Sequence, residues 1–137
     1  MPLVIATVDH IGIRVADAPR SEAFYAKLGF VVTARHREAS VVILRNPAGI
    51  EINLIVNADR ALDGPNVLMD VTPKRAGYTH VALGVASMEE TIRALGELGI
   101  PISEGPVKLG GGLSLFVRDP DLNVVELREH GRAAPAR

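Results

Sequence analysis

The feature that most constrains the fold is a repeat inside the chain. The stretch DHIGIRVAD at residues 9–17 recurs as THVALGVAS at residues 79–87, so that His10 and His80 hold the same place in the two copies. A repeated unit of this size is one supersecondary element, which buries its hydrophobic face only by packing against another unit. The chain is therefore expected to fold as two similar modules.

Each copy of the repeat alternates in the way a half-buried strand does. In the first copy, the face that runs from His10 to Arg14 is polar or small, while the residues between them are aliphatic. Successive side chains of a strand point to opposite faces, so the two kinds of residue separate. We expect the aliphatic face to pack under a helix and the histidine face to line a cavity.

A helix is predicted after each copy, over residues 18–28 and 88–98. Asp17 and Ser87 stand where an N-cap is needed, and a glycine follows each helix where a left-handed residue commonly ends it. Three further strands follow each helix, bounded by turn residues. They are residues 30–36, 40–45 and 50–55 in the first module and residues 102–104, 113–118 and 124–128 in the second, with a loop over residues 105–112.

The predicted fold class is therefore α+β, with two tandem β-α-β-β-β modules forming a curved sheet around a cavity. We expect one domain over residues 1–137. Its first module covers residues 5–57, its linker residues 58–76, its second module residues 77–130 and a frayed tail residues 131–137.

Composition narrows the function classes. A formal net charge of −1 gives no general attraction to nucleic acid or to an anionic membrane. The chain has no cysteine and no apolar run of spanning length, so neither a disulfide framework nor a membrane helix is expected. We expect a soluble cytoplasmic protein without nucleic-acid or membrane partners.

Four side chains carry the predicted chemistry. His10 and His80 begin the first strand of each module, and Glu51 and Glu126 lie on the last strand. Two imidazoles and two carboxylates suit Ni, Co, Zn, Fe or Mn better than Ca or Mg, which prefer oxygen ligands throughout. The sequence therefore predicts one divalent metal per site.

The fourth ligand has two candidates on one strand face. The motif Arg45-Asn46-Pro47 matches Arg118-Asp119-Pro120 at a separation of 73 residues, whereas Glu51 and Glu126 are 75 residues apart. Counted from the proline, Asn53 is the partner of Glu126. We assign the ligand to Glu51, because a carboxylate neutralises the cation.

The paired modules, their two histidines, the helix end FYAKLGF at residues 24–30 and the turn DPD at residues 119–121 resemble the vicinal oxygen chelate superfamily. This is the glyoxalase/bleomycin resistance/dioxygenase fold. Within it, His10, Glu51, His80 and Glu126 are similar to the metal shell of bacterial glyoxalase I, the lactoylglutathione lyases.

The resemblance implies an isomerase that acts on the hemithioacetal of a 2-oxoaldehyde and glutathione. Glu126 would move the proton, with Glu51 as its catalytic counterpart. It also implies that Arg14 meets a carboxylate of glutathione, while Lys108 and Asn53 are further substrate contacts. The family's glutathione-binding asparagine, four residues past the ligand, has no match at Ile55. A homodimer is implied as well.

Three other readings stay open. Fosfomycin-resistance transferases of this superfamily hold their metal with two histidines and one glutamate, and a thiol or water opens an epoxide. An extradiol dioxygenase uses iron with a similar shell. A bleomycin-resistance member binds its drug without metal. Metal content and ligand number distinguish these classes.

Overall fold

The computed structural model describes residues 1–131, which fall into two compact units that divide between Asp63 and Gly64. The first unit contains β1 (Ile11–Arg14), α1 (Ala18–Lys27), β2 (Val31–His36), β3 (Val41–Arg45) and β4 (Glu51–Ile55). The second contains β5 (His80–Gly84), α2 (Met88–Leu98), β6 (Glu104–Leu109), β7 (Gly112–Arg118) and β8 (Val124–His130). The predicted β-α-β-β-β order is confirmed in both units, and the tail predicted beyond Gly131 lies outside the described residues.

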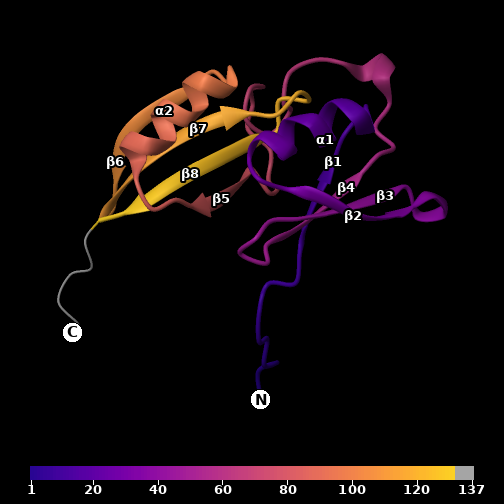
Figure 1. The fold of residues 1–137 in the computed structure, drawn as a ribbon. Coiled ribbons are helices and arrows are strands. Elements are labelled where there is room, and N and C mark those ends of the chain that lie inside the picture. Colours follow the sequence, from indigo (N-terminus) through magenta and orange to yellow (C-terminus); the bar gives the residue numbers. More distant parts are fainter. Residues whose placement is uncertain (132–137) are drawn as a thin grey trace. The chain divides into compact units, whose positions relative to one another are not determined.

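Each unit is built on a four-stranded sheet with the same topology (Figure 1). The strand order is β1-β4-β3-β2 in the first unit and β5-β8-β7-β6 in the second. The first strand of each unit runs parallel to the last, and the other neighbours are antiparallel. The helix is the crossover that lets the chain return for this parallel pairing. The strand that opens each repeat therefore lies beside the strand that closes it.

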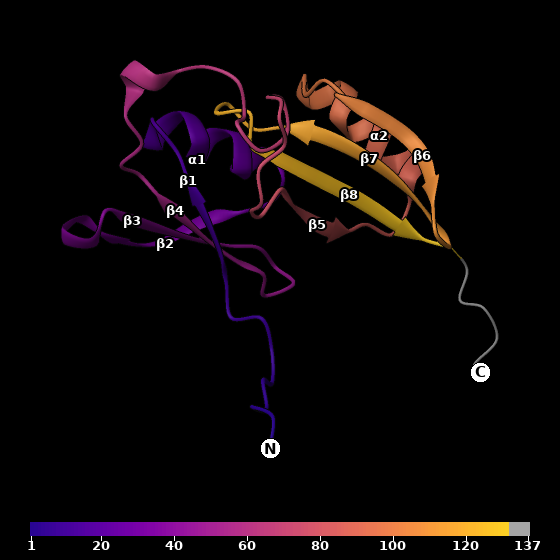
Figure 2. The same cartoon turned by 180° about the vertical axis from the view of Figure 1, so that it is seen from behind.

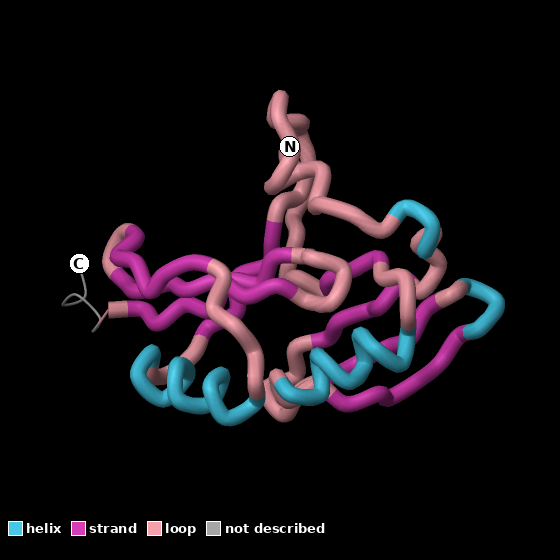
Figure 3. Tube along the Cα trace, turned by 90° about the horizontal axis from the view of Figure 1, so that it is seen from above, coloured by secondary structure: helices cyan, strands magenta, loops and turns pink. Residues whose placement is uncertain are grey.

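The aliphatic face of each sheet forms the core, as predicted. In the first unit, Ile13, Ile52 and Leu54 are at most 9% exposed, and Tyr25 of α1 is fully buried with them. In the second unit, Leu115 and Val117 are fully buried. Figures 2 and 3 show the helix of each unit alongside its own strands. The opposite sheet face is left to the histidines and their neighbours.

The caps predicted for the two helices are present. The Asp17 side chain accepts a hydrogen bond from the Arg20 backbone N–H at 3.1 Å, and Ser87 Oγ accepts one from Glu90 N–H at 3.2 Å. Gly99 ends α2 with φ of 70°, in the left-handed region that favours glycine. Among the described residues, no helix is long and apolar enough to cross a membrane.

The prediction of a loop over residues 105–112 is wrong, because β6 covers Glu104–Leu109. The register shifts between Glu104 and Val107, so Gly105 and Pro106 form a bulge inside the strand. β6 is an edge strand of its sheet, where a proline and a bulge are tolerated because one side of the strand has no ladder to maintain. Glycine and proline thus interrupt this strand without ending it.

The turn before β8 contains an unusual backbone conformation. Leu122 has φ of 66°, which is uncommon for a residue other than glycine. The matching residue before β4 is Gly49, with φ of 85°. Leu122 N–H donates to Asp119 O at 2.9 Å, so the turn is held closed by its own backbone.

Candidate functional site

In the second unit the fold brings His80 and Glu126 together. His80 is the first residue of β5, and Glu126 lies in the middle of β8, where it is opposite Ala82. Residues two apart on a strand share a face, so His80 and Glu126 point the same way. His80 Nε2 is 3.1 Å from Glu126 Oε1. This pairing of one imidazole with one carboxylate is what the sequence predicted for the module.

A chain of hydrogen bonds orients Glu126, which is only 7% exposed. Ser114 Oγ, fully buried on β7, donates to Glu126 Oε2 at 2.6 Å. Arg128 Nη1 donates to Ser114 Oγ at 3.0 Å, and its Nη2 donates to Leu109 O at 2.6 Å. One carboxylate oxygen is therefore anchored by Ser114, and the other is directed to His80.

The spacing of these two atoms fits a divalent ion. Two ligand atoms that each lie about 2.0–2.2 Å from one ion are separated by roughly 3 Å when the angle between them is near a right angle. A bare imidazole nitrogen and a carboxylate oxygen are both acceptors, so a proton or a cation has to stand between them at this distance. The donor chemistry of His80 and Glu126 therefore suits the predicted metal.

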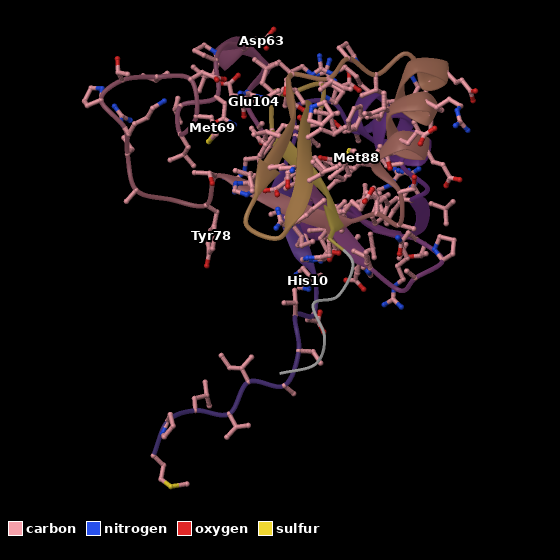
Figure 4. The ribbon with its side chains drawn as sticks, turned by 90° about the vertical axis from the view of Figure 1, so that its left-hand side faces the viewer. His10, Asp63, Met69, Tyr78, Met88 and Glu104 are labelled. Atoms are coloured by element: carbon pink, nitrogen blue, oxygen red, sulfur yellow. The ribbon has the colours of Figure 1, made fainter. Side chains whose placement is uncertain are left out.

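The first unit gathers a different set around His10. Its Nδ1 lies 2.7 Å from Asp9 Oδ1 and 4.0 Å from Glu51 Oε2. Glu51 Oε1 in turn accepts a hydrogen bond from Arg45 Nη2 at 2.6 Å, so its charge already has a partner. One ligand atom from each of Asp9, His10 and Glu51 lies within 4.8 Å of the others. Figure 4 shows His10 at the base of the extended N-terminal segment.

Asp9 was not foreseen by the sequence analysis. The available signal was that both repeat histidines follow a residue with a side-chain oxygen, Asp9 in one copy and Thr79 in the other. Such pairs are common in sequences, and only the coordinates show that both oxygens contact their histidine.

Strand register separates the two candidates for the fourth ligand. Asn53 is opposite Gly12 of β1 and Ile43 of β3. Glu126 is opposite Ala82 and Phe116, which are the corresponding residues of the second unit. Asn53 therefore occupies the rung equivalent to that of Glu126, and Glu51 lies two residues nearer the start of its strand.

The Asn53 side chain also has an unused acceptor. Its Oδ1 is buried and, among the described residues, has no hydrogen-bond partner. Buried polar atoms usually have a partner, and an exception calls for an explanation such as an unseen water or ion. An amide oxygen that faces the histidine side of the sheet is a chemically suitable donor to a divalent ion.

Arg14 contacts a residue that the sequence analysis did not select. Arg14 lies on the same face of β1 as Gly12, and its Nε donates to Asn57 Oδ1 at 3.0 Å. Asn57 is four residues past Asn53. The resemblance implies an asparagine four residues after the metal ligand. If the ligand is Asn53 and not Glu51, that position is Asn57 and not Ile55.

The structure places Lys108 away from these groups. Lys108 of β6 is opposite Leu113 of β7, whereas the next β7 residue, Ser114, contacts Glu126. Opposed residues of antiparallel strands point to the same face, so Lys108 lies on the other side of the sheet from Glu126. The predicted anion contact through Lys108 therefore receives no support from the register.

The segment predicted as a linker is tied to the turn before β8. Arg118 donates to both carboxylate oxygens of Asp70, at 2.7 and 2.8 Å, and also to Leu122 O at 3.0 Å. The Asn66 amide donates to the same carbonyl at 3.1 Å. The hydrogen bonds from Arg118 hold the pKa of the Asp70 carboxyl below its usual value. The bridge therefore anchors this segment to the end of β7.

Comparison with known proteins gives consistent matches over nearly the whole chain. The family described as the glyoxalase/bleomycin resistance protein/dioxygenase superfamily matches residues 7–127. The uncharacterised protein YwkD of Bacillus subtilis is 30% identical over 138 residues, which cover 93% of this chain and 99% of that protein.

Two solved structures illustrate the shared fold. A glyoxalase/dioxygenase from Nostoc punctiforme aligns with a TM-score of 0.71 and 24% identity, over 96% of this chain and 99% of its own. A genomically encoded fosfomycin resistance protein from Listeria monocytogenes aligns with a TM-score of 0.66 and 19% identity, over 92% and 94%. At these identities the likeness concerns the fold.

Proposed function

Because this chain belongs to the glyoxalase/bleomycin resistance protein/dioxygenase superfamily, we propose that it is a divalent-metal-dependent enzyme of the glyoxalase type. It would isomerise, or transfer a proton on, a small substrate that chelates the metal through two adjacent oxygens. The observation that carries this proposal is the buried Glu126 carboxylate, anchored by Ser114 and directed to His80 Nε2 at 3.1 Å.

The ligand set that we propose is His10, His80, Glu126 and an oxygen from β4. This set is the ligand pattern that the resemblance to the glyoxalases implies. The register and the unpaired Oδ1 favour Asn53 as that oxygen, whereas the negative charge of a carboxylate favours Glu51. A bound divalent ion of the Ni, Co, Zn, Fe or Mn group would stabilise negative charge that develops on the substrate oxygens.

The chain's own residues would perform the proton transfer. Glu126 is suited to this role because Ser114 holds Oε2 while Oε1 points to the open histidine face. A positioned general base contributes about 10²–10⁴ in rate. Glu126→Gln should therefore lower turnover by at least about 10², at a cost of about 1 kcal/mol or less in the free energy of unfolding. If this variant keeps the wild-type turnover, Glu126 is not the general base.

Arg14 and Asn57 support an anionic substrate end. The Arg14 guanidinium is directed by Asn57 Oδ1, and a planar guanidinium binds carboxylates through paired hydrogen bonds. This pair is consistent with glutathione as a cosubstrate. We expect Arg14→Lys to raise KM for the thiol more than it lowers kcat, because a lysine cannot reproduce the paired geometry.

Metal analysis tests the proposal first. Protein purified without a His-tag should hold about one of these ions per chain, and His10→Ala should lose it. Asn53→Ala and Glu51→Ala then separate the two candidates, because only the true ligand should lower metal content. Absence of metal after reconstitution would refute the enzyme proposal and point to drug binding without metal.

A fosfomycin-resistance type of activity is the second candidate. Asn53, and not Glu51, is at the strand position equivalent to Glu126. If Glu51 is not a ligand, the remaining histidine and carboxylate ligands are two histidines and one glutamate, which is the set expected for that class. Assays with methylglyoxal plus glutathione, and with fosfomycin plus thiol or water, distinguish the two. Turnover of fosfomycin alone would replace the glyoxalase assignment.

We also propose that the chain forms a homodimer. Residues 1–10 lie outside helix and strand, and Leu3, Val4, Ile5 and Val8 are 78–88% exposed. A contiguous exposed apolar segment marks an interaction surface. Light scattering should give a dimer for wild type and a monomer for the double substitution Val4→Asp, Ile5→Asp, with Leu62→Asp as an exposed control. A monomeric wild type would refute this assembly.

A further inference from the structure

In both units the residue before the repeat histidine bonds to the same ring nitrogen. Asp9 Oδ1 lies 2.7 Å from His10 Nδ1, and Thr79 Oγ1 lies 2.8 Å from His80 Nδ1. Neighbouring residues inside a strand point to opposite faces. These contacts form because Asp9 and Thr79 precede β1 and β5, where the backbone is not yet committed to the sheet.

The two oxygens differ in what they allow. An ionised carboxylate only accepts hydrogen bonds, so His10 Nδ1 carries the hydrogen and Nε2 keeps its lone pair. The Thr79 hydroxyl both donates and accepts, so it is compatible with either tautomer of His80. The hydrogen bond that a ring nitrogen makes decides which nitrogen remains free to bind a metal.

Glu51 does not duplicate this function. Its Oε2 is 4.0 Å from His10 Nδ1, beyond hydrogen-bond range, and its Oε1 is engaged by Arg45. Asp9 is thus the carboxylate within hydrogen-bonding distance of the ring. The side chain of His10 is 43% exposed, so its orientation is not set by burial alone.

We propose that Asp9 is a positioning residue that holds His10 as the Nδ1–H tautomer and presents Nε2 as the ligand atom. This assignment rests on the proposed metal-dependent function. It also has a consequence that does not involve metal, because the tautomer exists in the metal-free protein. At His80, in contrast to His10, the Thr79 hydroxyl can donate to Nδ1, which leaves the ring hydrogen on Nε2 toward Glu126 in the metal-free protein.

Two substitutions separate hydrogen bonding from charge. Asp9→Ala removes the acceptor, whereas Asp9→Asn keeps an acceptor oxygen and removes the charge. Nitrogen-15 NMR of the metal-free proteins at about pH 8.5, where imidazole is ordinarily neutral, reports which ring nitrogen is protonated. We expect Nδ1–H at His10 in wild type, a mixture of both tautomers in Asp9→Asn, because an amide both donates and accepts, and the largest shift toward Nε2–H in Asp9→Ala.

Zinc affinity provides the second readout, by competition with a chromogenic chelator. Loss of a group that orients a metal-bound histidine typically weakens the metal by about 10–100-fold. We expect a loss in this range for Asp9→Ala and a smaller loss for Asp9→Asn. Asp63→Asn is the matched control and should change neither readout, because Asp63 is an exposed aspartate directly after the short 3-10 helix Arg60–Leu62.

The outcomes are distinguishable from failure of the proposed function. An unchanged tautomer and zinc affinity in Asp9→Ala would overturn the positioning role while leaving metal binding intact. Equal affinity losses in both Asp9 variants without a tautomer change would also overturn it, because Asp9 would then act through its charge or as a ligand. Zinc binding absent from wild type would refute the metal proposal, and the NMR comparison alone would then decide whether Asp9 sets the tautomer.

Discussion

Replacing Ser114 by alanine tests the hydrogen-bond chain that orients Glu126. Ser114 is fully buried, donates to Glu126 Oε2 at 2.6 Å and accepts from Arg128. Alanine is nearly the same size, so the main loss is the hydrogen bond to a buried carboxylate. Hydrogen bonds to charged groups contribute about 1.5–3 kcal/mol, and we expect Ser114→Ala to lower the free energy of unfolding by about 2 kcal/mol.

A double-mutant cycle attributes this loss to the Ser114–Glu126 pair. Glu126→Gln keeps the shape of the side chain and removes its charge. A charge-assisted hydrogen bond is roughly twice as strong as a neutral one. Ser114→Ala should therefore cost about 1 kcal/mol less in the Glu126→Gln background than in wild type.

The measurement is urea unfolding of metal-free protein, because a bound ion would stabilise the native state separately. Far-UV and near-UV circular dichroism should give coincident transitions if a single free energy is to be derived. Ser103→Ala is the control, since Ser103 Oγ donates to a neutral carbonyl, Phe116 O, at 3.0 Å on the exposed surface. It should cost about 1 kcal/mol or less.

Two results would refute the reasoning. If Ser114→Ala costs less than about 0.5 kcal/mol, the hydrogen bond does not stabilise the buried carboxylate. If the cost is the same with Glu126 and with Gln at that position, the effect comes from packing and not from the charge. Either result would also weaken the claim that Ser114 orients Glu126 for proton transfer.

Three further predictions concern the backbone and the acid response. Gly105→Ala should lower the free energy of unfolding by more than about 2 kcal/mol, because φ is +88° and an added Cβ would lie 2.7 Å from Ser114 O. Urea unfolding measures this loss, and a near-neutral change would contradict the bulge geometry. Leu122→Val should cost about 1–2 kcal/mol more than Leu122→Gly, because a branched side chain is strained at φ of 66°; equal midpoints would contradict this. The Asp70 pKa is lowered in the folded state by Arg118, so its stabilising effect is present above the unfolded pKa near about 3.9 and is lost as pH falls through the lower folded pKa. Asp70→Asn should therefore flatten the acid side of the stability profile, and an unchanged profile would contradict the contribution of this ion pair.

Much of the fold followed from local patterns. The alternation after His10 and His80 indicated two equivalent strands, and the caps Asp17 and Ser87 begin the helices at the predicted residues. These signals were sufficient because side-chain alternation and capping depend on residues that are neighbours in sequence. The repeat then set the number of modules and their common topology.

The edge strand β6 could not be predicted in the same way. Its residues include Gly105 and Pro106, which ordinarily mark a turn. Only pairing with β7 on one side, and the absence of a further strand on the other side within the described sheet, make a bulged strand compatible with them.

The candidate site also has features that the sequence predicts and features that only the structure shows. The sequence by itself identified candidate ligands, because His10 and His80 hold matching places in the two repeats and Glu126 lies on the last strand of its module. Only the tertiary structure decided that Asn53 shares the rung of Glu126, that Asp9 contacts His10, and that Lys108 faces the other way. Each of these depends on the pairing register and on side-chain direction. A difference of one or two residues moves a side chain to another face or another rung, and the amino-acid pattern of one strand does not specify its offset from the next.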